Sequence, residues 1–162
     1  YGIKCDTAST HIIQLLLQAN NLTGYLPDSI GNLTNVQVLS LDIPPNALTG
    51  TLPASIGQLK MLSVFTIASQ HFYGSIPESI GDCNSLSILH FGGNRFSSIP
   101  DSINKLGPMS SFAIEDNNMN GVKLPDEGPE LIGNNDCDLS GNVFECPIPK
   151  WAEADFCRAT CR

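Results

Sequence analysis

A Leu-Pro or Ile-Pro pair returns along the whole chain, beginning at Leu26, Leu52, Ile76, Ile99, Leu124 and Ile148. The steps between these positions are 26, 24, 23, 25 and 24 residues. An interval this steady indicates internal repeats, each a short unit that buries its apolar side only by stacking on its neighbours. The 162 residues are therefore predicted to form one stack of about six units, in a single domain.

Every unit carries the same internal pattern. It begins with two apolar residues separated by one other residue, such as Leu15 and Leu17 or Phe65 and Ile67. This period of two is typical of a short strand with one buried face. A side-chain amide follows in each unit, at Asn20, Asn46, Gln70, Asn94, Asn117 and Asn142. A buried amide repeated at one level can bond the backbone of its own turn and of the adjacent unit, so that no polar group there is orphaned.

These residues resemble the leucine-rich repeat family, specifically its extracellular, plant-type subclass. The matching pattern is L-x-L-x-x-N-x-L, followed by L-T-G-x-L-P as at Leu22 and S-I-G-x-L as at Ser29, and it covers about residues 11–149. The resemblance implies an α/β repeat solenoid, a right-handed coil with a parallel sheet on its concave face. It also implies short 3₁₀ or helical segments on the convex face and a second, smaller sheet.

The ends of the chain and two insertions depart from the repeat. The sequence YGIKCD resembles the end of the family's N-terminal cap, so we expect residues 1–12 to be its remnant, with Cys5 unpaired. Residues 13–133 are the predicted repeats, and residues 134–162 the last repeat with a C-terminal cap. Pro44-Pro45 adds two residues after a strand and predicts a bulge, whereas residues 126–130 predict an irregular acidic loop.

Five further cysteines accompany Cys5. Cys83 stands where other units have Leu and is predicted to be a buried free thiol. Four lie near the C-terminus, and they allow three pairings, of which we favour Cys137–Cys157 with Cys146–Cys161. A zinc site is the competing interpretation, but no C-x-x-C pair is present. Phe144 and Trp151 are expected to plug the end of the solenoid, although Trp151 could instead anchor a ligand.

The charge and the motifs exclude several classes of function. A net charge of −8 argues against nucleic-acid binding. No catalytic signature is present, and His11, His71 and His90 have no spaced Ser, Cys or carboxylate partner in the sequence. We therefore expect no enzyme activity, no cofactor and no bound metal.

The outward positions of the strands are the candidate binding residues, because this family usually binds through its concave face. They are Gln14, Leu16, Gln18, Val38, Ser40, Asp42, Val64, Thr66, Ala68, Ile88, His90, Ser111, Ala113, Glu115, Asp136 and Asp138. We expect Leu16, Val38, Val64 and Ile88 to form an exposed apolar row, with acidic residues toward the C-terminal end. Such a surface fits a partner with apolar groups and a basic patch, although β-propensity alone could account for the row.

The predicted function is a non-catalytic recognition module that binds a protein or peptide, as part of a cell-surface receptor-like protein or kinase. The alternatives are a free secreted inhibitor, resembling the polygalacturonase-inhibiting proteins, and an adhesive or structural wall protein. Sequons at Asn21 and Asn32 predict N-glycosylation and agree with an extracellular or cell-surface location. We expect the isolated protein to be a monomer.

Overall fold

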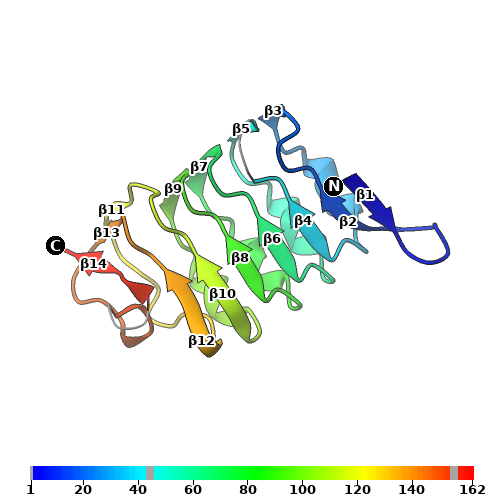
Figure 1. The fold of residues 1–162 in the computed structure, drawn as a ribbon. Coiled ribbons are helices and arrows are strands. Elements are labelled where there is room, and N and C mark those ends of the chain that lie inside the picture. The colour runs from blue at the N-terminus through cyan, green and yellow to red at the C-terminus, as the bar shows by residue number, and fades with distance from the viewer. Residues whose placement is uncertain (1, 43–45, 154–156) are drawn as a thin grey trace.

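The structure is a computed structural model that describes residues 2–42, 46–153 and 157–162. The described residues form a solenoid whose coils stack side by side, with the two ends of the chain at opposite ends of the stack (Figure 1). The predicted bulge at Pro44-Pro45 lies outside the described residues. The α/β repeat solenoid is confirmed, because parallel strands alternate with 3₁₀ turns along the chain.

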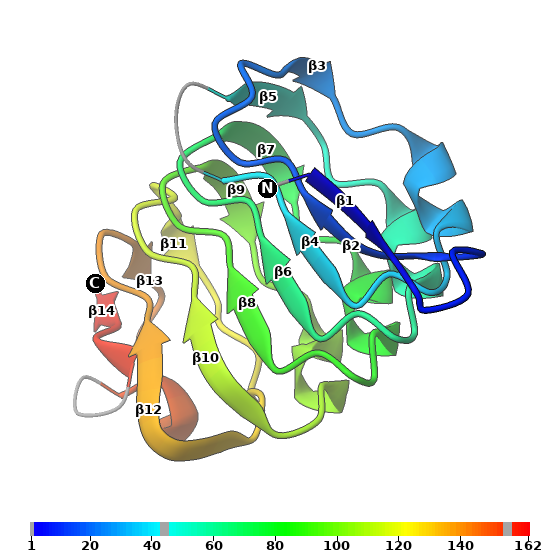
Figure 2. The same ribbon diagram turned by 45° about the vertical axis from the view of Figure 1, so that its right-hand side comes forward.

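One face of the solenoid is a sheet to which each coil adds a strand (Figure 2). In the described residues its order is β1 (Gly2–Cys5), β2 (Ile12–Leu16), β4 (Val38–Ser40), β6 (Val64–Thr66), β8 (Ile88–His90), β10 (Met109–Ala113) and β12 (Leu131–Asp138). All neighbours are parallel except β1, which pairs antiparallel with β2. Strand β1 thus covers the edge that β2 would otherwise expose.

Two smaller sheets follow the strands of the main sheet around each coil. One consists of β3 (Thr23–Tyr25), β5 (Ala47–Gly50), β7 (His71–Ser75) and β9 (Arg95–Ser98). The other consists of β11 (Asn120–Val122), β13 (Val143–Phe144) and β14 (Thr160–Cys161). The predicted second sheet is therefore present, as two separate sheets, and the C-terminal strand β14 is the last strand of the second of them.

The recurrent Leu-Pro and Ile-Pro pairs mark the start of the 3₁₀ turns. These turns are η1 (Asp28–Asn32), η2 (Ala54–Gln58), η3 (Glu78–Asp82), η4 (Asp101–Lys105) and η5 (Lys150–Ala152). Before the first four turns the proline has φ between −77° and −69° and ψ between 140° and 154°. Proline is suited to this place because its ring fixes φ near such values and its missing N–H is not needed there.

The Ser-Ile-Gly motif lets successive 3₁₀ turns lie close together. A Cβ built on Gly57 would come within 2.7 Å of the Cβ of Ser79 and within 2.5 Å of the Ser79 carbonyl oxygen. Gly31 meets Ser55 in the same way, and Gly81 meets Ser102. Glycine is needed in these turns because any side chain would overlap the serine of the next coil.

The predicted amide ladder is confirmed from the second coil onward, where it joins each coil to the one before it. Asn20 in the first coil is exposed instead, and its Nδ2 donates only to the Gln18 carbonyl oxygen of its own turn. Asn46 Oδ1 accepts hydrogen bonds from the backbone N–H groups of Asn20 and Leu22, at 3.0 and 2.9 Å. Asn46 Nδ2 donates to the carbonyl oxygens of Leu17 and Leu41, at 2.7 and 2.9 Å. Asn94, Asn117 and Asn142 repeat this arrangement. The ladder therefore satisfies buried backbone groups that no strand pairs.

The C-terminal cap closes the last coil with two disulfides. Cys137 bonds Cys157 and Cys146 bonds Cys161, the pairing that the sequence analysis favours. Trp151 contributes to the same closure. Its Nε1 donates to the Pro125 carbonyl oxygen at 2.9 Å, and its ring packs edge-on to Phe112 with centroids 6.3 Å apart. A side chain at Gly128 would overlap the Trp151 ring. Trp151 therefore covers the core, as the plug interpretation expects.

Candidate ligand-binding face

The outward side of the seven-stranded sheet, which we call the concave face, carries two rows of side chains fixed by the strand register. The first concave row consists of Gln14, Val38, Val64, Ile88, Ser111 and Asp136. The second concave row consists of Leu16, Ser40, Thr66, His90, Ala113 and Asp138. Neither row holds a Lys or Arg.

This register corrects the composition of the predicted apolar row. Leu16 lies opposite Ser40 in the second concave row, and Gln14 takes the place beside Val38. The apolar part of the first row is therefore Val38, Val64 and Ile88, all half-buried. Alternation along a strand shows which side chains point outward, but only the pairing of strands shows which of them are neighbours.

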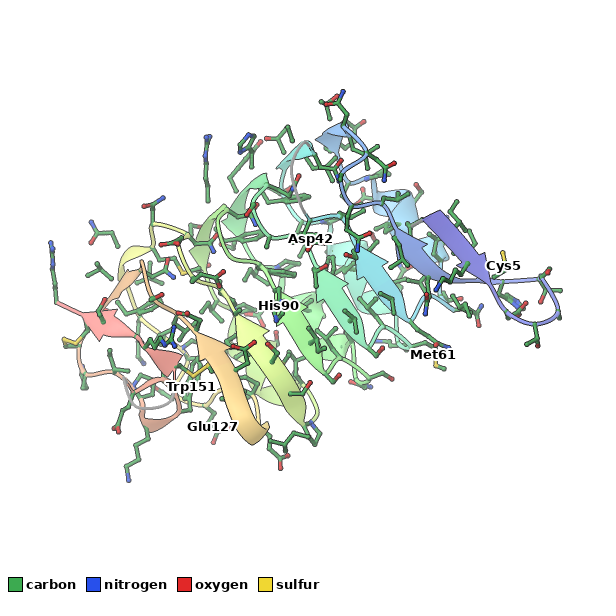
Figure 3. All side chains as sticks on the ribbon, viewed as in Figure 1. Cys5, Asp42, Met61, His90, Glu127 and Trp151 are labelled. Atoms are coloured by element: carbon green, nitrogen blue, oxygen red, sulfur yellow. A yellow bond between two sulfur atoms is a disulfide. The ribbon has the colours of Figure 1, made fainter. Side chains whose placement is uncertain are left out.

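His90, Ser111 and Asp136 form a hydrogen-bonded chain across β8, β10 and β12, from the middle of this face, where Figure 3 labels His90, to the last strand of the sheet. His90 Nε2 lies 2.6 Å from Ser111 Oγ, and Ser111 Oγ lies 2.9 Å from Asp136 Oδ2. The sequence analysis assigned His90 no such partners, because they are more than 20 residues away. The order of the groups is not that of a nucleophilic triad. The Ser111 hydroxyl donates to the carboxylate and accepts from His90, whereas a triad needs the carboxylate behind the histidine.

A second polar cluster lies on β4 and β6, next to β8 on its N-terminal side. Ser40 Oγ donates to Asp42 Oδ1 at 2.6 Å, and Thr66 Oγ1 lies 2.8 Å from Ser40 Oγ and 2.9 Å from Asp42 Oδ1. Ser40 and Thr66 are buried, so their hydroxyls hold the Asp42 carboxylate in place more than they offer contacts of their own. Asp42 remains half-exposed beyond the end of β4 (Figure 3).

The acidic residues toward the C-terminal end differ in how far they are neutralised. Arg158 Nη1 lies 3.0 Å from Asp138 Oδ2, and the Ser140 backbone N–H donates to Asp138 Oδ1 at 2.9 Å. Burial opposes ionisation of Asp138, but these bonds from Ser140 and Arg158 hold its pKa below the ordinary value. Most of the hydrogen-bonding capacity of Asp138 is therefore used by contacts within the protein. Asp136 is exposed and bonds only through Ser111 among the described contacts.

Glu115 has the opposite character. Its carboxylate lies over Gly92, where a Cβ would overlap it, and its Oε2 is buried with no hydrogen-bond partner in the described residues. Burial is the main cause that raises the pKa of Glu115, and the Asp138 charge adds to the effect while His90 opposes it. Glycine at position 92 thus leaves space for the Glu115 carboxylate, which has few polar partners in this place.

The other predicted candidates lie where the repeat pattern places them. Gln18, Ala68 and Ala113 are half-buried on the concave side. Gln18 Oε1 has no described partner and is shielded from water. His71 is exposed on β7, away from the concave face, and His11 bonds Asp6 at 3.0 Å in the N-terminal hairpin. His90 is thus the one predicted histidine within the described concave rows.

The remaining predicted sites lie off the face. Asn21 and Asn32 are exposed. Cys5 is exposed and Cys83 is buried, and both are free thiols, as predicted. Burial raises the pKa of the Cys83 thiol to about 11, so it stays protonated at neutral pH.

No cluster of three or more His, Cys, Asp or Glu side chains in 2–42, 46–153 and 157–162 is arranged to hold a metal ion. None of the helical segments in those same ranges has the length and apolar character needed to cross a bilayer.

Comparisons with known proteins agree with this architecture. The family model described as Leucine Rich Repeat matches residues 11–33 and 85–106. No curated protein matches the chain. Among solved structures, the BIR2 ectodomain from Arabidopsis thaliana is 26% identical, with a TM-score of 0.75, over 87% of this chain and 73% of that one.

Two further solved structures are similar. A chain of the BIR3–SERK2 complex from Arabidopsis thaliana is 25% identical, with a TM-score of 0.67, over 99% of this chain and 76% of that one. A plant ice-binding protein is 28% identical, with a TM-score of 0.71, over 88% of this chain and 46% of that one. The repeat motif, the coil geometry and these matches together show that the chain folds as a leucine-rich repeat solenoid.

Proposed function

We propose that this protein is a non-catalytic extracellular recognition module that binds a protein or peptide on its concave face. The observation that carries the proposal is the character of that face. Half-buried Val38, Val64 and Ile88 lie in a line across β4, β6 and β8. Past Ile88 the same row continues to Ser111 and the exposed Asp136, and the half-exposed Asp42 lies to the side of the line, beyond the end of β4. An apolar strip bordered by charge is the usual composition of an interface.

The similarity to receptor proteins supports this function. The solved neighbours include an ectodomain and a chain from a complex between two proteins. The two disulfides of the cap fit an oxidising, extracellular compartment. We propose a role within a cell-surface receptor-like protein or kinase, with N-glycans on exposed Asn21 and Asn32 and with a monomeric isolated domain.

The charge of the concave face limits which kinds of partner would fit it. Asp42 and Asp136 are accessible, Asp138 is paired with Arg158, and neither concave row holds a Lys or Arg. We therefore propose a partner with an apolar segment and two basic groups, one placed to meet Asp136 past the Ile88 end of the apolar line and one placed to meet Asp42 at its side.

Ice binding, suggested by the third neighbour, has less support. It would require a regular outward lattice of one residue type, whereas the second concave row runs Leu16, Ser40, Thr66, His90 and Ala113, of which Ser40 and Thr66 are buried.

A selection from random twelve-residue peptides displayed on phage tests the proposal, with the biotinylated protein as bait. Enriched sequences, remade as synthetic peptides, should bind the wild-type protein and lose at least tenfold in affinity for Ile88→Arg. The matched control is Met61→Arg, because Met61 is 51% exposed and lies away from the concave face (Figure 3). Peptides that bind both variants equally, or no enrichment at all, would contradict the proposal.

The receptor role needs a separate test, which is to determine the coding sequence that flanks this segment. A downstream segment of about 20 apolar residues supports a membrane-anchored receptor, whereas a stop codon shortly after Arg162 supports the secreted inhibitor. A Ser/Pro-rich stalk supports an adhesive wall protein.

A further inference from the structure

A groove of about 420 Å³ lies on the four-stranded sheet, on a different side of the solenoid from the concave face. Tyr25 on β3 and Tyr73 on β7 line it, together with Pro27 and Asp28 before and in the first 3₁₀ turn. The segment Thr49 to Thr51, from β5, lies between the two tyrosines. The groove is therefore built by three successive coils.

The two tyrosines are not required by the repeat. Tyr73 stands where the neighbouring units have Thr23, Thr49 and Ser97, and Tyr25 stands where they have Thr51 and Ser75. Tyr25 is 73% exposed and Tyr73 is 51% exposed. Neither ring is in an aromatic pair within the described part of the chain. Two large rings in place of small hydroxyl residues, both exposed beside one groove, contribute little to folding and are suited to contact with another molecule.

The backbone keeps the groove open between the rings. Gly50 has φ +92°, and a Cβ there would lie 3.2 Å from the Cβ of Tyr25. A residue with a side chain at this position would be strained by its φ value and would press on the tyrosine. The floor between the rings is thus bare backbone with threonine hydroxyls beside it.

The spacing and the charge point to one kind of occupant. Strand β5 separates β3 from β7, so the tyrosines lie two strand spacings apart, about 9 to 10 Å across the sheet. They are also offset by two residues along the strands, because Tyr25 pairs with Thr49 and Thr49 pairs with His71, so the line from one tyrosine to the other runs diagonally over β5 and is about 12 Å long. A polyproline II helix advances about 3.1 Å per residue, so about four residues of such a segment, laid diagonally over β5, span the distance between the two tyrosines. Asp28 lies in the groove, and the net charge of the chain is −8, which favours a basic residue in the ligand.

We propose that this groove binds a proline-rich segment in the polyproline II conformation, with a basic residue placed against Asp28. Preformed helices of this type lose little conformational entropy on docking into aromatic-lined grooves. The site is separate from the concave face, and the proposal does not depend on the function proposed above. A neutral oligosaccharide is the competing occupant, because it too stacks on exposed aromatic rings.

The test is a fluorescence-anisotropy titration with a labelled peptide of four Ala-Pro-Pro repeats and an Arg at each end. The comparison probes are the same peptide with Gly in place of Pro, the proline peptide without Arg, and cellohexaose as an unlabelled ligand followed by calorimetry. The variants are Tyr25→Ala, Tyr73→Ala and Asp28→Asn, with Met61→Ala as an exposed control away from the groove and Ile88→Arg as a concave-face control. Thermal unfolding establishes that each variant is folded.

The proposal expects saturable binding of the proline peptide with a micromolar Kd. Each tyrosine variant should weaken it at least fivefold, and Met61→Ala and Ile88→Arg should leave it unchanged. Asp28→Asn should weaken binding of the Arg peptide at least threefold and leave the Arg-free peptide unaffected. Equal binding of the glycine peptide, insensitivity to both tyrosine variants, binding of cellohexaose alone, or no saturable binding would each overturn the proposal. A response of Ile88→Arg but not of Tyr73→Ala would place the peptide on the concave face instead.

Discussion

The amide ladder makes a quantitative prediction at Asn94, a side chain that is 3% exposed. Its Oδ1 accepts from the Phe72 N–H at 3.0 Å, and its Nδ2 donates to the Ile67 carbonyl oxygen at 2.9 Å, both in the preceding coil. Nδ2 also lies 2.9 Å from the Phe91 carbonyl oxygen of its own coil. Asn94→Ala removes these three bonds at once, together with a longer one from Nδ2 to the Gly92 carbonyl oxygen at 3.3 Å.

The expected cost follows from the groups left behind. The Phe91 oxygen retains a bond from Asn117 at 3.2 Å, so it is not orphaned. The Phe72 N–H and the Ile67 oxygen lose the side-chain partner on which they depend across the coil boundary. At about 1 to 3 kcal/mol for each of these two buried unsatisfied groups, Asn94→Ala should lower the free energy of unfolding by about 2 to 6 kcal/mol.

Gln70 provides an internal comparison at the same level of the preceding coil. Its Oε1 accepts from the Leu48 N–H at 3.0 Å, but its Nε2 reaches only the Ala68 and Ser69 oxygens of its own turn, at 3.3 and 3.1 Å. Gln70→Ala therefore breaks one bond between coils where Asn94→Ala breaks two. We expect a loss of about 1 to 2 kcal/mol for Gln70→Ala.

Urea unfolding followed by far-UV circular dichroism measures both losses. Asn84→Ala is the matched control, because Asn84 is an exposed asparagine in the same solenoid and should change stability by less than about 0.5 kcal/mol. Losses of equal size for Asn94→Ala and Gln70→Ala would refute the reasoning, since the ladder would then act through side-chain volume rather than through bonds between coils.

Three further predictions rest on packing, charge and covalent closure. Gly57→Ala should destabilise the protein by about 2 kcal/mol in urea unfolding, because its Cβ would lie 2.5 Å from the Ser79 oxygen. Gly107→Ala, whose Cβ would have its nearest neighbour at 3.3 Å, should change stability little, and equal losses would contradict this account. Glu115→Gln should stabilise the protein at pH 7 by a few tenths to about 1 kcal/mol after solvent screening. Because burial raises the pKa of Glu115, the stability it contributes is present at acidic pH and is lost as the pH rises through that pKa. The advantage of Glu115→Gln in thermal melts should therefore shrink toward pH 4, and an advantage that grows there would be inconsistent with it. Cys137→Ala with Cys157→Ala opens a loop with a sequence separation of 20 and should cost about 3 kcal/mol in urea unfolding without dithiothreitol. No difference between this double variant and the wild-type protein would count against a stabilising cap.

The repeat pattern predicted the fold closely because its signals are local. Each coil contains its own strand, amide, proline and glycine within about 24 residues. The structural role of Asn94 or Pro77 could therefore be predicted from neighbouring residues in the sequence alone. The stacked coils then follow, since one coil cannot bury its apolar side without the next.

The candidate site was predicted less completely because it depends on contacts between coils. The outward residues were identified individually, but Leu16 was grouped with the wrong neighbours until the strand register was known. The chain from His90 through Ser111 to Asp136 likewise requires three strands in register. The tyrosine groove was missed, although the sequence holds a signal for it. That signal is Tyr73, which replaces the threonine of the L-T-G motif.

The contact between glycine and serine in successive 3₁₀ turns also bears on how such a chain can lengthen in evolution. A duplicated unit inserted among the first three coils brings its own glycine and its own serine, so both new junctions match the old ones. Asn104 occupies the glycine position of the fourth coil, and no regular 3₁₀ turn follows in the next coil within the described residues. A unit added after that coil would meet the Asn104 side chain where its serine needs space. Gain and loss of repeats should therefore be confined to the N-terminal side of Asn104, and relatives of different length should share the segment from Asn104 to the cap.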